Sequence, residues 1–336
     1  MSAVAEDPRS APSLRWGILG PGWIAGTFAR AVRGHTRSQV AAVGSRSRDR
    51  AERFATAHQI PTTHVGYEAL VADPHVDAIY VASPHSEHRE HALLAIAAGK
   101  HVLVEKAFTR NEAEGREVIE AARAAGVFCM EAMWTRFLPH MVALRAVLAR
   151  GEIGEVVTVV ADHGQSFSRL PATHRLLDPA LAGGALLDLG VYPVSFAHDL
   201  FGAPTTVQAT GALTDTGVDG QASMLLGYGD KRHAVLTTTQ WSRTATTAVI
   251  AGTDGRIEIR SDFYQPTSFE VIRDDGTRWE WTRPVEGGFQ FQVAEAARRI
   301  ADGEIESPRM THQGTLEVLA TMDEVRRQIG VRYPGE

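Results

Sequence analysis

Cysteine is almost absent: Cys129 is the one thiol in a chain of 336 residues. A single thiol excludes an internal disulfide framework and multi-cysteine metal clusters, and it is typical of a reducing compartment. Because Cys129 lies in the apolar run 127–130, we expect it to be buried and structural.

Basic residues are outnumbered, with 34 Lys and Arg against 40 Asp and Glu and a formal net charge of -6. We find no basic patch, so neither nucleic acid nor an anionic membrane is an expected partner. Residues 1–13 lack the basic and apolar regions of a signal peptide, and no apolar run approaches the length that crosses a bilayer. We therefore expect a cytoplasmic protein whose residues 1–13 form a flexible tail.

What the sequence does contain is a Gly-rich turn between an apolar run and a helical pattern. Gly20, Gly22 and Ala25 fit the G-x-G-x-x-A pattern. The first glycine serves the tight turn, the second lets the backbone approach a pyrophosphate, and the alanine packs helix on strand. The helix start at Trp23 and Ile24 offers N–H groups and a partial positive charge to phosphates. These residues predict the phosphate-binding turn of a dinucleotide-binding domain.

Strands and helices are expected to alternate over residues 14–133. This rhythm predicts a Rossmann domain, a doubly wound α/β fold with a parallel sheet and helices on both faces. Ligands of such sheets gather at the carboxyl ends of the strands. After the first strand and helix, we expect strands at 39–45, 63–65, 78–83, 101–105 and 127–131, and helices at 48–58, 67–72, 87–98 and 111–125.

The end of the second strand bears on cofactor choice. An NAD-binding protein usually places an acidic residue there for the ribose hydroxyls, but this chain has Ser45, Arg46 and Arg48, with no carboxylate before Asp49. A hydroxyl and a guanidinium suit a 2′-phosphate. We therefore favour NADP, with NAD as the second possibility. The alternative is that Arg46 and Arg48 are solvent-exposed loop residues that bind no cofactor.

From about residue 151 the pattern changes to runs rich in Val, Thr and aromatic residues. Two Asp-Gly pairs at 254–255 and 275–276 indicate hairpins. We predict an α+β domain over 134–336 with a large, mostly antiparallel open sheet, whose bare face suits a homodimer or a dimer of dimers. Its expected strands lie at 156–163, 207–213, 222–228, 234–241, 246–251, 256–260, 269–273 and 278–282, and its helices at 139–149, 186–201, 290–301 and 312–328.

Two stretches carry candidate chemistry. Lys106 ends a strand that should point at a nicotinamide, although a lysine after a strand is more often a surface residue. Asp188 and Tyr192 lie four positions apart, so a helix there would place a carboxylate and a phenol on one face. The alternative for this pair is a half-buried Tyr near an acid at the start of a helix.

Together these motifs resemble the glucose-fructose oxidoreductase, inositol dehydrogenase and rhizopine-catabolism (Gfo/Idh/MocA) family. That family carries E-K-P where this chain has Glu105-Lys106-Ala107, and D-x-x-x-H where Asp188 is followed by Tyr192. The tyrosine, together with the run 130–137, looks like the branch with dimeric dihydrodiol dehydrogenase and NADP-dependent aldose dehydrogenases.

The resemblance implies hydride transfer between NADP and a CH–OH carbon of an aldose, polyol or cyclic trans-diol. Tyr192 would be the general acid or base, and Lys106 would assist it. Asp188 would bind a second substrate hydroxyl or orient Lys106. Trp134 would line the substrate pocket. The remaining candidates are the substrate contacts Arg136, Phe137, His174 and Arg175 and the cofactor contacts Ser83, Pro84, His85, His88 and Glu105.

Two alternatives remain open at this point. One is a reductase of a keto-sugar or dicarbonyl, with Tyr192 as the acid. The other is a catalytically silent NADP-binding regulator, against which the presence of both Lys106 and Tyr192 speaks. His85 and His88 have no evident third partner, so we expect no metal site. Ala107 replaces the family's proline, and the sequence leaves open whether the peptide before it is cis.

Overall fold

The computed structural model describes residues 4–167, 169–171, 173–229 and 231–336. The chain forms two compact units. The first unit comprises Glu6–Trp134 and Gly287–Leu316. The second unit comprises Met1–Ala5, Thr135–Glu286 and Glu317–Glu336.

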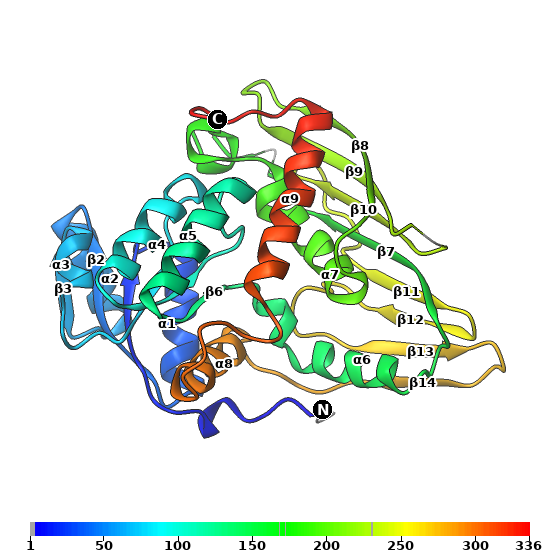
Figure 1. Ribbon diagram of the computed structural model, residues 1–336, viewed down its shortest axis with the longest axis horizontal. Coiled ribbons are helices and arrows are strands. Elements are labelled where there is room, and N and C mark those ends of the chain that lie inside the picture. Colours follow the sequence, from blue (N-terminus) through cyan, green and yellow to red (C-terminus); the bar gives the residue numbers. More distant parts are fainter. Residues whose placement is uncertain (1–3, 168, 172, 230) are drawn as a thin grey trace. The chain divides into compact units, whose positions relative to one another are not determined.

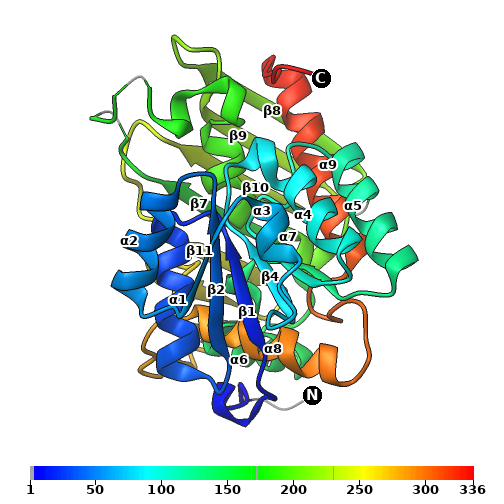
Figure 2. The same cartoon turned by 90° about the vertical axis from the view of Figure 1, so that its left-hand side faces the viewer.

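A six-stranded parallel sheet in the order β3-β2-β1-β4-β5-β6 organises the first unit. Figure 2 shows α1 and α2 on one face of this sheet and α3, α4 and α5 on the other. The predicted doubly wound fold is therefore confirmed. Its strands are β1 (Arg15–Leu19), β2 (Gln39–Ser45), β3 (Thr62–Val65), β4 (Ala78–Val81), β5 (His101–Val104) and β6 (Cys129–Glu131). Its helices are α1 (Trp23–His35), α2 (Arg48–His58), α3 (Tyr67–Val71), α4 (His88–Ala97) and α5 (Glu112–Ala125).

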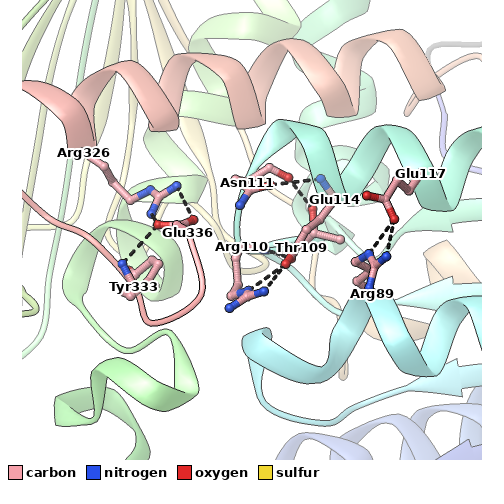
Figure 3. Close-up of polar contacts among 9 residues, drawn as sticks. All are labelled: Arg89, Thr109, Arg110, Asn111, Glu114, Glu117, Arg326, Tyr333 and Glu336. Carbon is pink, nitrogen blue, oxygen red and sulfur yellow. Dashed lines mark hydrogen bonds and ion pairs between the residues drawn. The ribbon is translucent and has the colours of Figure 1, made fainter.

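Local sequence sets the helix ends in this unit. Ser47 Oγ accepts from the Arg50 N–H and caps α2. Asn111 Oδ1 accepts from the Glu114 N–H at 2.9 Å, and Gly126 ends α5 in the left-handed conformation at φ 65°. Figure 3 shows the Asn111 cap. The figure also shows a separate ion pair that joins α4 to α5, between Arg89 and Glu117.

Cys129 is buried as expected, and burial raises the pKa of its thiol to about 12.

Two expectations about the chain's organisation need correction. Residues 6–13 are not a loose tail: Pro8–Ser10 forms the short 3-10 helix η1, and Arg298 donates to the Asp7 carbonyl and Ser10 Oγ at 3.0 Å each. Residues 1–3 lie outside the described part of the chain. Helix α8 (Phe289–Ala301), which we assigned to the second domain, packs against α1 and η1 in the first unit. An amphipathic pattern predicts a buried helix face but does not say which element covers it.

An eight-stranded sheet organises the second unit, in the order β14-β13-β12-β11-β7-β10-β9-β8 (Figure 1). Its neighbouring strands are antiparallel except β7 and β10, as the prediction of a mostly antiparallel sheet requires. The strands are β7 (Val156–Gly164), β8 (Thr206–Leu213), β9 (Asp219–Gly227), β10 (His233–Thr239), β11 (Ala248–Gly252), β12 (Gly255–Ile259), β13 (Phe269–Arg273) and β14 (Arg278–Trp281).

Helices cover one face of this sheet, where α6 (Pro139–Ala149) and α7 (Val191–Phe201) lie. Helix α9 (His312–Ile329) begins in the first unit and continues into the second after Leu316. One helical stretch, Pro179–Phe201, is long and apolar enough to span a membrane by length and composition, contrary to our reading of the sequence. Because 83% of its apolar window is buried inside the protein, it is packed as a core element.

Candidate active site

The turn after β1 has the geometry of an anion site. Gly20 has φ 97°, and a Cβ there would lie 3.0 Å from the Ala82 carbonyl oxygen, so the turn requires glycine. A Cβ on Gly22 would meet no atom within 4 Å, and α1 has no side-chain cap. The start of α1 at Trp23 and Ile24 is thus open to a pyrophosphate, while Ala25 is fully buried beneath it. These residues fit a dinucleotide.

Two guanidinium groups follow β2. Arg46 Nη1 lies 3.3 Å from Glu87 Oε1, and Arg48 Nη1 lies 3.8 Å from Glu52 Oε1. Both arginine side chains are largely exposed, whereas Ser45 is buried and its Oγ accepts from the Ser47 N–H. Exposed arginines can bind a phosphate bidentately, so this edge of the sheet fits a 2′-phosphate.

His88 ties together the loops that follow β4 and β5. Its Nδ1 lies 2.9 Å from the Ala107 carbonyl oxygen and its Nε2 lies 2.9 Å from the Ser83 carbonyl oxygen. Since carbonyl oxygens only accept, both bonds are made when both ring nitrogens carry a proton. His85 Nε2 lies 3.3 Å from the Lys106 carbonyl oxygen. His88 therefore holds the Lys106 loop against the loop after β4, and its predicted contact with the cofactor stays a prediction. The peptide between Lys106 and Ala107 is cis.

Buried carboxylates hold the backbone on either side of Lys106. Glu105 accepts from the Tyr80 hydroxyl through Oε1 and from the Lys106 N–H through Oε2. Glu131 Oε1 accepts from the Phe108 N–H at 3.1 Å. The Glu105 carboxylate therefore accepts hydrogen bonds from groups inside the protein. Its predicted contact with the cofactor stays a prediction.

The second candidate stretch combines two kinds of helix. Leu186–Gly190 forms a π-helical turn, η6, which leads into α7, where we predicted one continuous helix. Single π turns are frequent at functional sites. Arg175 is a predicted substrate contact, and its Nη2 lies 3.3 Å from Asp188 Oδ1. A carboxylate and a guanidinium thus adjoin in the second unit.

Aromatic and polar side chains that we did not predict as site residues surround Tyr192. The ring centroids of His163 and Tyr264 lie 5.2 and 4.6 Å from that of Tyr192 and 4.2 Å from each other. Burial raises the pKa of Tyr264, and the nearby charge of Asp188 acts in the same direction, so Asp188 also adjoins this cluster.

Hydrogen bonds determine the protonation of His163. Its Nδ1 lies 3.2 Å from the Leu189 carbonyl oxygen, and its Nε2 lies 3.1 Å from the Gln165 amide nitrogen. The carbonyl needs a donor, so Nδ1 carries the proton and Nε2 accepts from the amide. The sequence could have predicted His163 as a site residue, because it lies at the carboxyl end of an expected strand. Tyr264 had no such signal, since it lies in the loop after β12.

The other predicted substrate contacts also have partners within the protein, and their roles stay predictions. Arg136 is buried, and its Nε and Nη2 donate to Ser195 Oγ and the Ser195 carbonyl oxygen at 3.0 Å each, which anchors α7. Phe137 is in the core. His174 Nδ1 accepts from a backbone N–H in the short helix Arg175–Leu177. Trp134 packs against Phe289 in the first unit, with ring centroids 4.8 Å apart. Positions 168 and 172, between β7 and the short helix Arg175–Leu177, lie outside the described residues.

Asp219, the first residue of β9, anchors the start of the Asp188–Tyr192 segment. Its Oδ2 accepts from the Leu186 N–H at 2.6 Å. A Cβ on Gly184, which has φ 118°, would lie 2.1 Å from Asp219 Oδ1. On the other side of this turn, the Tyr333 hydroxyl donates to the Gly183 carbonyl at 2.7 Å. Figure 3 shows how Glu336 joins Tyr333 to Arg326.

The Asp219 carboxyl is expected to make folding stability depend on pH. Burial raises its pKa from 3.8 to about 6, despite the hydrogen bond from Leu186. A raised carboxyl pKa means that the folded state binds more protons between pH 4 and 6. The free energy of unfolding should therefore rise by up to about 3 kcal/mol as the pH falls through that window. Asp219→Asn should lack this pH-dependent contribution to the free energy of unfolding. Urea denaturation of both proteins at pH 4 and pH 7 checks it, and identical pH dependence would contradict it.

Comparisons with known proteins agree with this geometry. A model described as an oxidoreductase family with an NAD-binding Rossmann fold matches residues 14–133, and a GFO/IDH/MocA C-terminal domain model matches residues 141–258. Trans-1,2-dihydrobenzene-1,2-diol dehydrogenase of Mus musculus is 38% identical, covering 96% of this chain and 98% of the relative. D-xylose 1-dehydrogenase (NADP(+)) of Hypocrea jecorina is 35% identical, covering 96% and 93%.

Solved structures share the fold. A 3-ketoreductase from Actinomadura kijaniata, in complex with NADP and TDP-benzene, matches with a TM-score of 0.85 and 27% identity over 95% of this chain and 98% of that one. An aldose-aldose oxidoreductase from Caulobacter crescentus, complexed with glycerol, matches with a TM-score of 0.85 and 25% identity over 94% and 97%. The predicted resemblance is thus confirmed, and the chain belongs to the Gfo/Idh/MocA family of NAD(P)-dependent oxidoreductases.

Proposed function

We propose that this protein is an NADP-dependent dehydrogenase of an aldose, a polyol or a cyclic trans-diol. The observation that carries the proposal is the setting of Tyr192, a phenol among polar and aromatic side chains, in the unit that also pairs Asp188 with Arg175. Relatives that act on a dihydrodiol and on D-xylose support the substrate class.

Tyr192 is proposed to exchange the proton of the reacting hydroxyl. The nicotinamide, when bound, supplies the hydride acceptor at C4. A phenol with an ordinary pKa near 10 is a poor base at neutral pH. The proposal therefore requires the Lys106 ammonium to stabilise the phenolate during the reaction and so lower that pKa. Inside the first unit, His88 and Glu105 hold the backbone from which Lys106 extends.

The remaining roles concern binding. Asp188 and Arg175 present an acceptor and donors suited to neighbouring hydroxyl groups, and Trp134 offers an apolar face for the C–H side of a sugar. On the cofactor side, the Gly20 to Ala25 turn is proposed to hold the pyrophosphate. Arg46 and Arg48 are proposed to hold the 2′-phosphate, and the loop Ser83-Pro84-His85 to border the nicotinamide half.

Initial rates of NADPH formation test this function. The panel is D-xylose, D-glucose, myo-inositol and a trans-dihydrodiol, each with NADP and with NAD. Turnover with NADP on one substrate class supports the proposal. Silence across the panel, with NADP binding measured independently, would overturn it in favour of the reductase direction or a silent regulator. The structural likeness to a 3-ketoreductase favours the reductase as the second candidate, and the ratio of rates in the two directions at neutral pH separates the two.

We also propose a homodimer through the uncovered face of the large sheet. Val160, Val235 and Leu225 stand side by side in register on β7, β10 and β9, with exposed fractions of 45, 39 and 43%. Such a row is an apolar surface that a second copy could cover. We expect twice the chain mass in sedimentation equilibrium at micromolar protein, and a shift toward monomer in Val235→Glu. A wild-type monomer would contradict the proposal.

A further inference from the structure

The carboxylate of Glu87 lies beside Arg46, the arginine proposed to favour NADP over NAD. Glu87 is the last residue of the short helix η2 (His85–Glu87), which follows β4, whereas Arg46 follows β2. Glu87 Oε1 lies 3.3 Å from Arg46 Nη1. The Arg46 side chain is 73% exposed and that of Glu87 is 21% exposed. The chain thus brings an acid to the end of β2 from another loop, although β2 itself ends without one.

Neighbouring groups leave this pairing in place at neutral pH. His91 Nδ1, on α4, is 4.0 Å from Glu87 Oε2 and 2.9 Å from Ser83 Oγ. Burial, together with the positive charges of His88 and Arg46, lowers the pKa of His91 to about 4. His91 is therefore neutral at pH 7 and does not draw Glu87 from Arg46 as a cation. On α3, burial raises the pKa of Tyr67, while the charge of Arg46 acts to lower it, so Tyr67 also borders the pair.

We propose that Glu87 sets the preference between NADP and NAD by competing with the 2′-phosphate for Arg46. The inference rests on the proposed role of Arg46 as a phosphate ligand. A 2′-phosphate approaching Arg46 meets the like charge of the Glu87 carboxylate, which disfavours NADP. An unphosphorylated ribose instead brings a neutral hydroxyl, which can donate to that carboxylate. Glu87 therefore weakens the preference for NADP that Arg46 creates.

Isothermal titration of the full-length protein with NADP and with NAD tests this inference without turnover. Glu87→Gln keeps the shape of the side chain and removes its charge. We expect the ratio of NADP affinity to NAD affinity to rise roughly three- to tenfold at low salt, and the gain to shrink in 0.5 M NaCl because salt screens exposed charges. Glu87→Asp, which keeps the charge, should stay close to the wild-type ratio.

A matched control is available on α5. Glu117 pairs with Arg89 of α4, and the two side chains are 52% and 41% exposed. Glu117→Gln removes the same charge from an exposed pair that contains no proposed phosphate ligand, so it should leave the affinity ratio unchanged. An equal rise in Glu117→Gln would show that net charge alone is responsible and would overturn the role of Glu87.

A double-mutant cycle separates this inference from the function on which it rests. Arg46→Ala should lower NADP affinity more than NAD affinity, and Glu87→Gln should then have no further effect on the ratio. If Arg46→Ala leaves NADP affinity unchanged, the proposed role of Arg46 fails. If Arg46→Ala lowers it but Glu87→Gln leaves the ratio at the wild-type value, the competition by Glu87 fails and the role of Arg46 stands.

Discussion

Tyr192→Phe is expected to lower kcat about 10²-fold or more and to leave NADP affinity close to wild type. The substitution removes one hydroxyl, so the ring keeps its contacts with His163 and Tyr264. The reacting alcohol would then have no group to take its proton as the hydride leaves. Steady-state rates and NADP titration on the same preparation measure the two effects separately.

Tyr264→Phe is the matched control for that prediction. Its hydroxyl accepts from the Gln165 and Gln265 amides at 3.3 and 2.8 Å, and its ring lies in the same cluster. If proton exchange belongs to Tyr192, loss of the Tyr264 hydroxyl should reduce turnover far less. Near-normal turnover in Tyr192→Phe would remove Tyr192 from the proposed chemistry, and a larger loss in Tyr264→Phe would move the role there.

Lys106→Ala is expected to reduce turnover at neutral pH by about 10²-fold as well, for an electrostatic reason. Without the ammonium, the phenolate loses its stabilising charge, and the pKa of the catalytic phenol moves up. The rising limb of kcat/KM against pH should therefore move to higher pH, with partial recovery of rate in alkaline buffer.

Lys231→Ala provides the comparison for Lys106→Ala. Lys231 forms an exposed pair with Glu155 at 2.6 Å in the second unit, so its removal changes net charge by the same amount with little effect on stability. We expect an unchanged rate and pH profile. If Lys106→Ala lowers the rate but leaves the pH profile unchanged, Lys106 does not stabilise the phenolate and is instead a substrate or cofactor contact.

Much of the first unit follows from local sequence. Parallel strands buried on both faces appear as short apolar runs, and β2 was predicted with the bounds that the structure shows. Gly20 marks the turn because its φ of 97° and the close approach of the Ala82 carbonyl restrict that position to glycine, whereas Gly22 leaves the start of α1 open. Ser47 and Gly126 mark helix ends through contacts that span only a few residues.

Contacts between distant segments were not predictable in this way. The pattern of α8 shows that one face is buried, but its partners α1 and η1 lie far away in the sequence. The neighbours of Arg136 in the chain did not predict that its buried guanidinium donates to Ser195, because a buried charge finds its partners through tertiary packing. Its substrate contact stays a prediction.

The family, the Rossmann turn and the candidates Lys106, Asp188 and Tyr192 were therefore predictable from the chain alone, because they depend on residue type and short spacing. The side chains that surround them became known from the fold. It placed His163 and Tyr264 against Tyr192, Asp219 at the Leu186 N–H, and Glu87 beside Arg46. Each of these contacts joins segments whose separation along the chain leaves no periodic signal, so packing and charge pairing alone establish them.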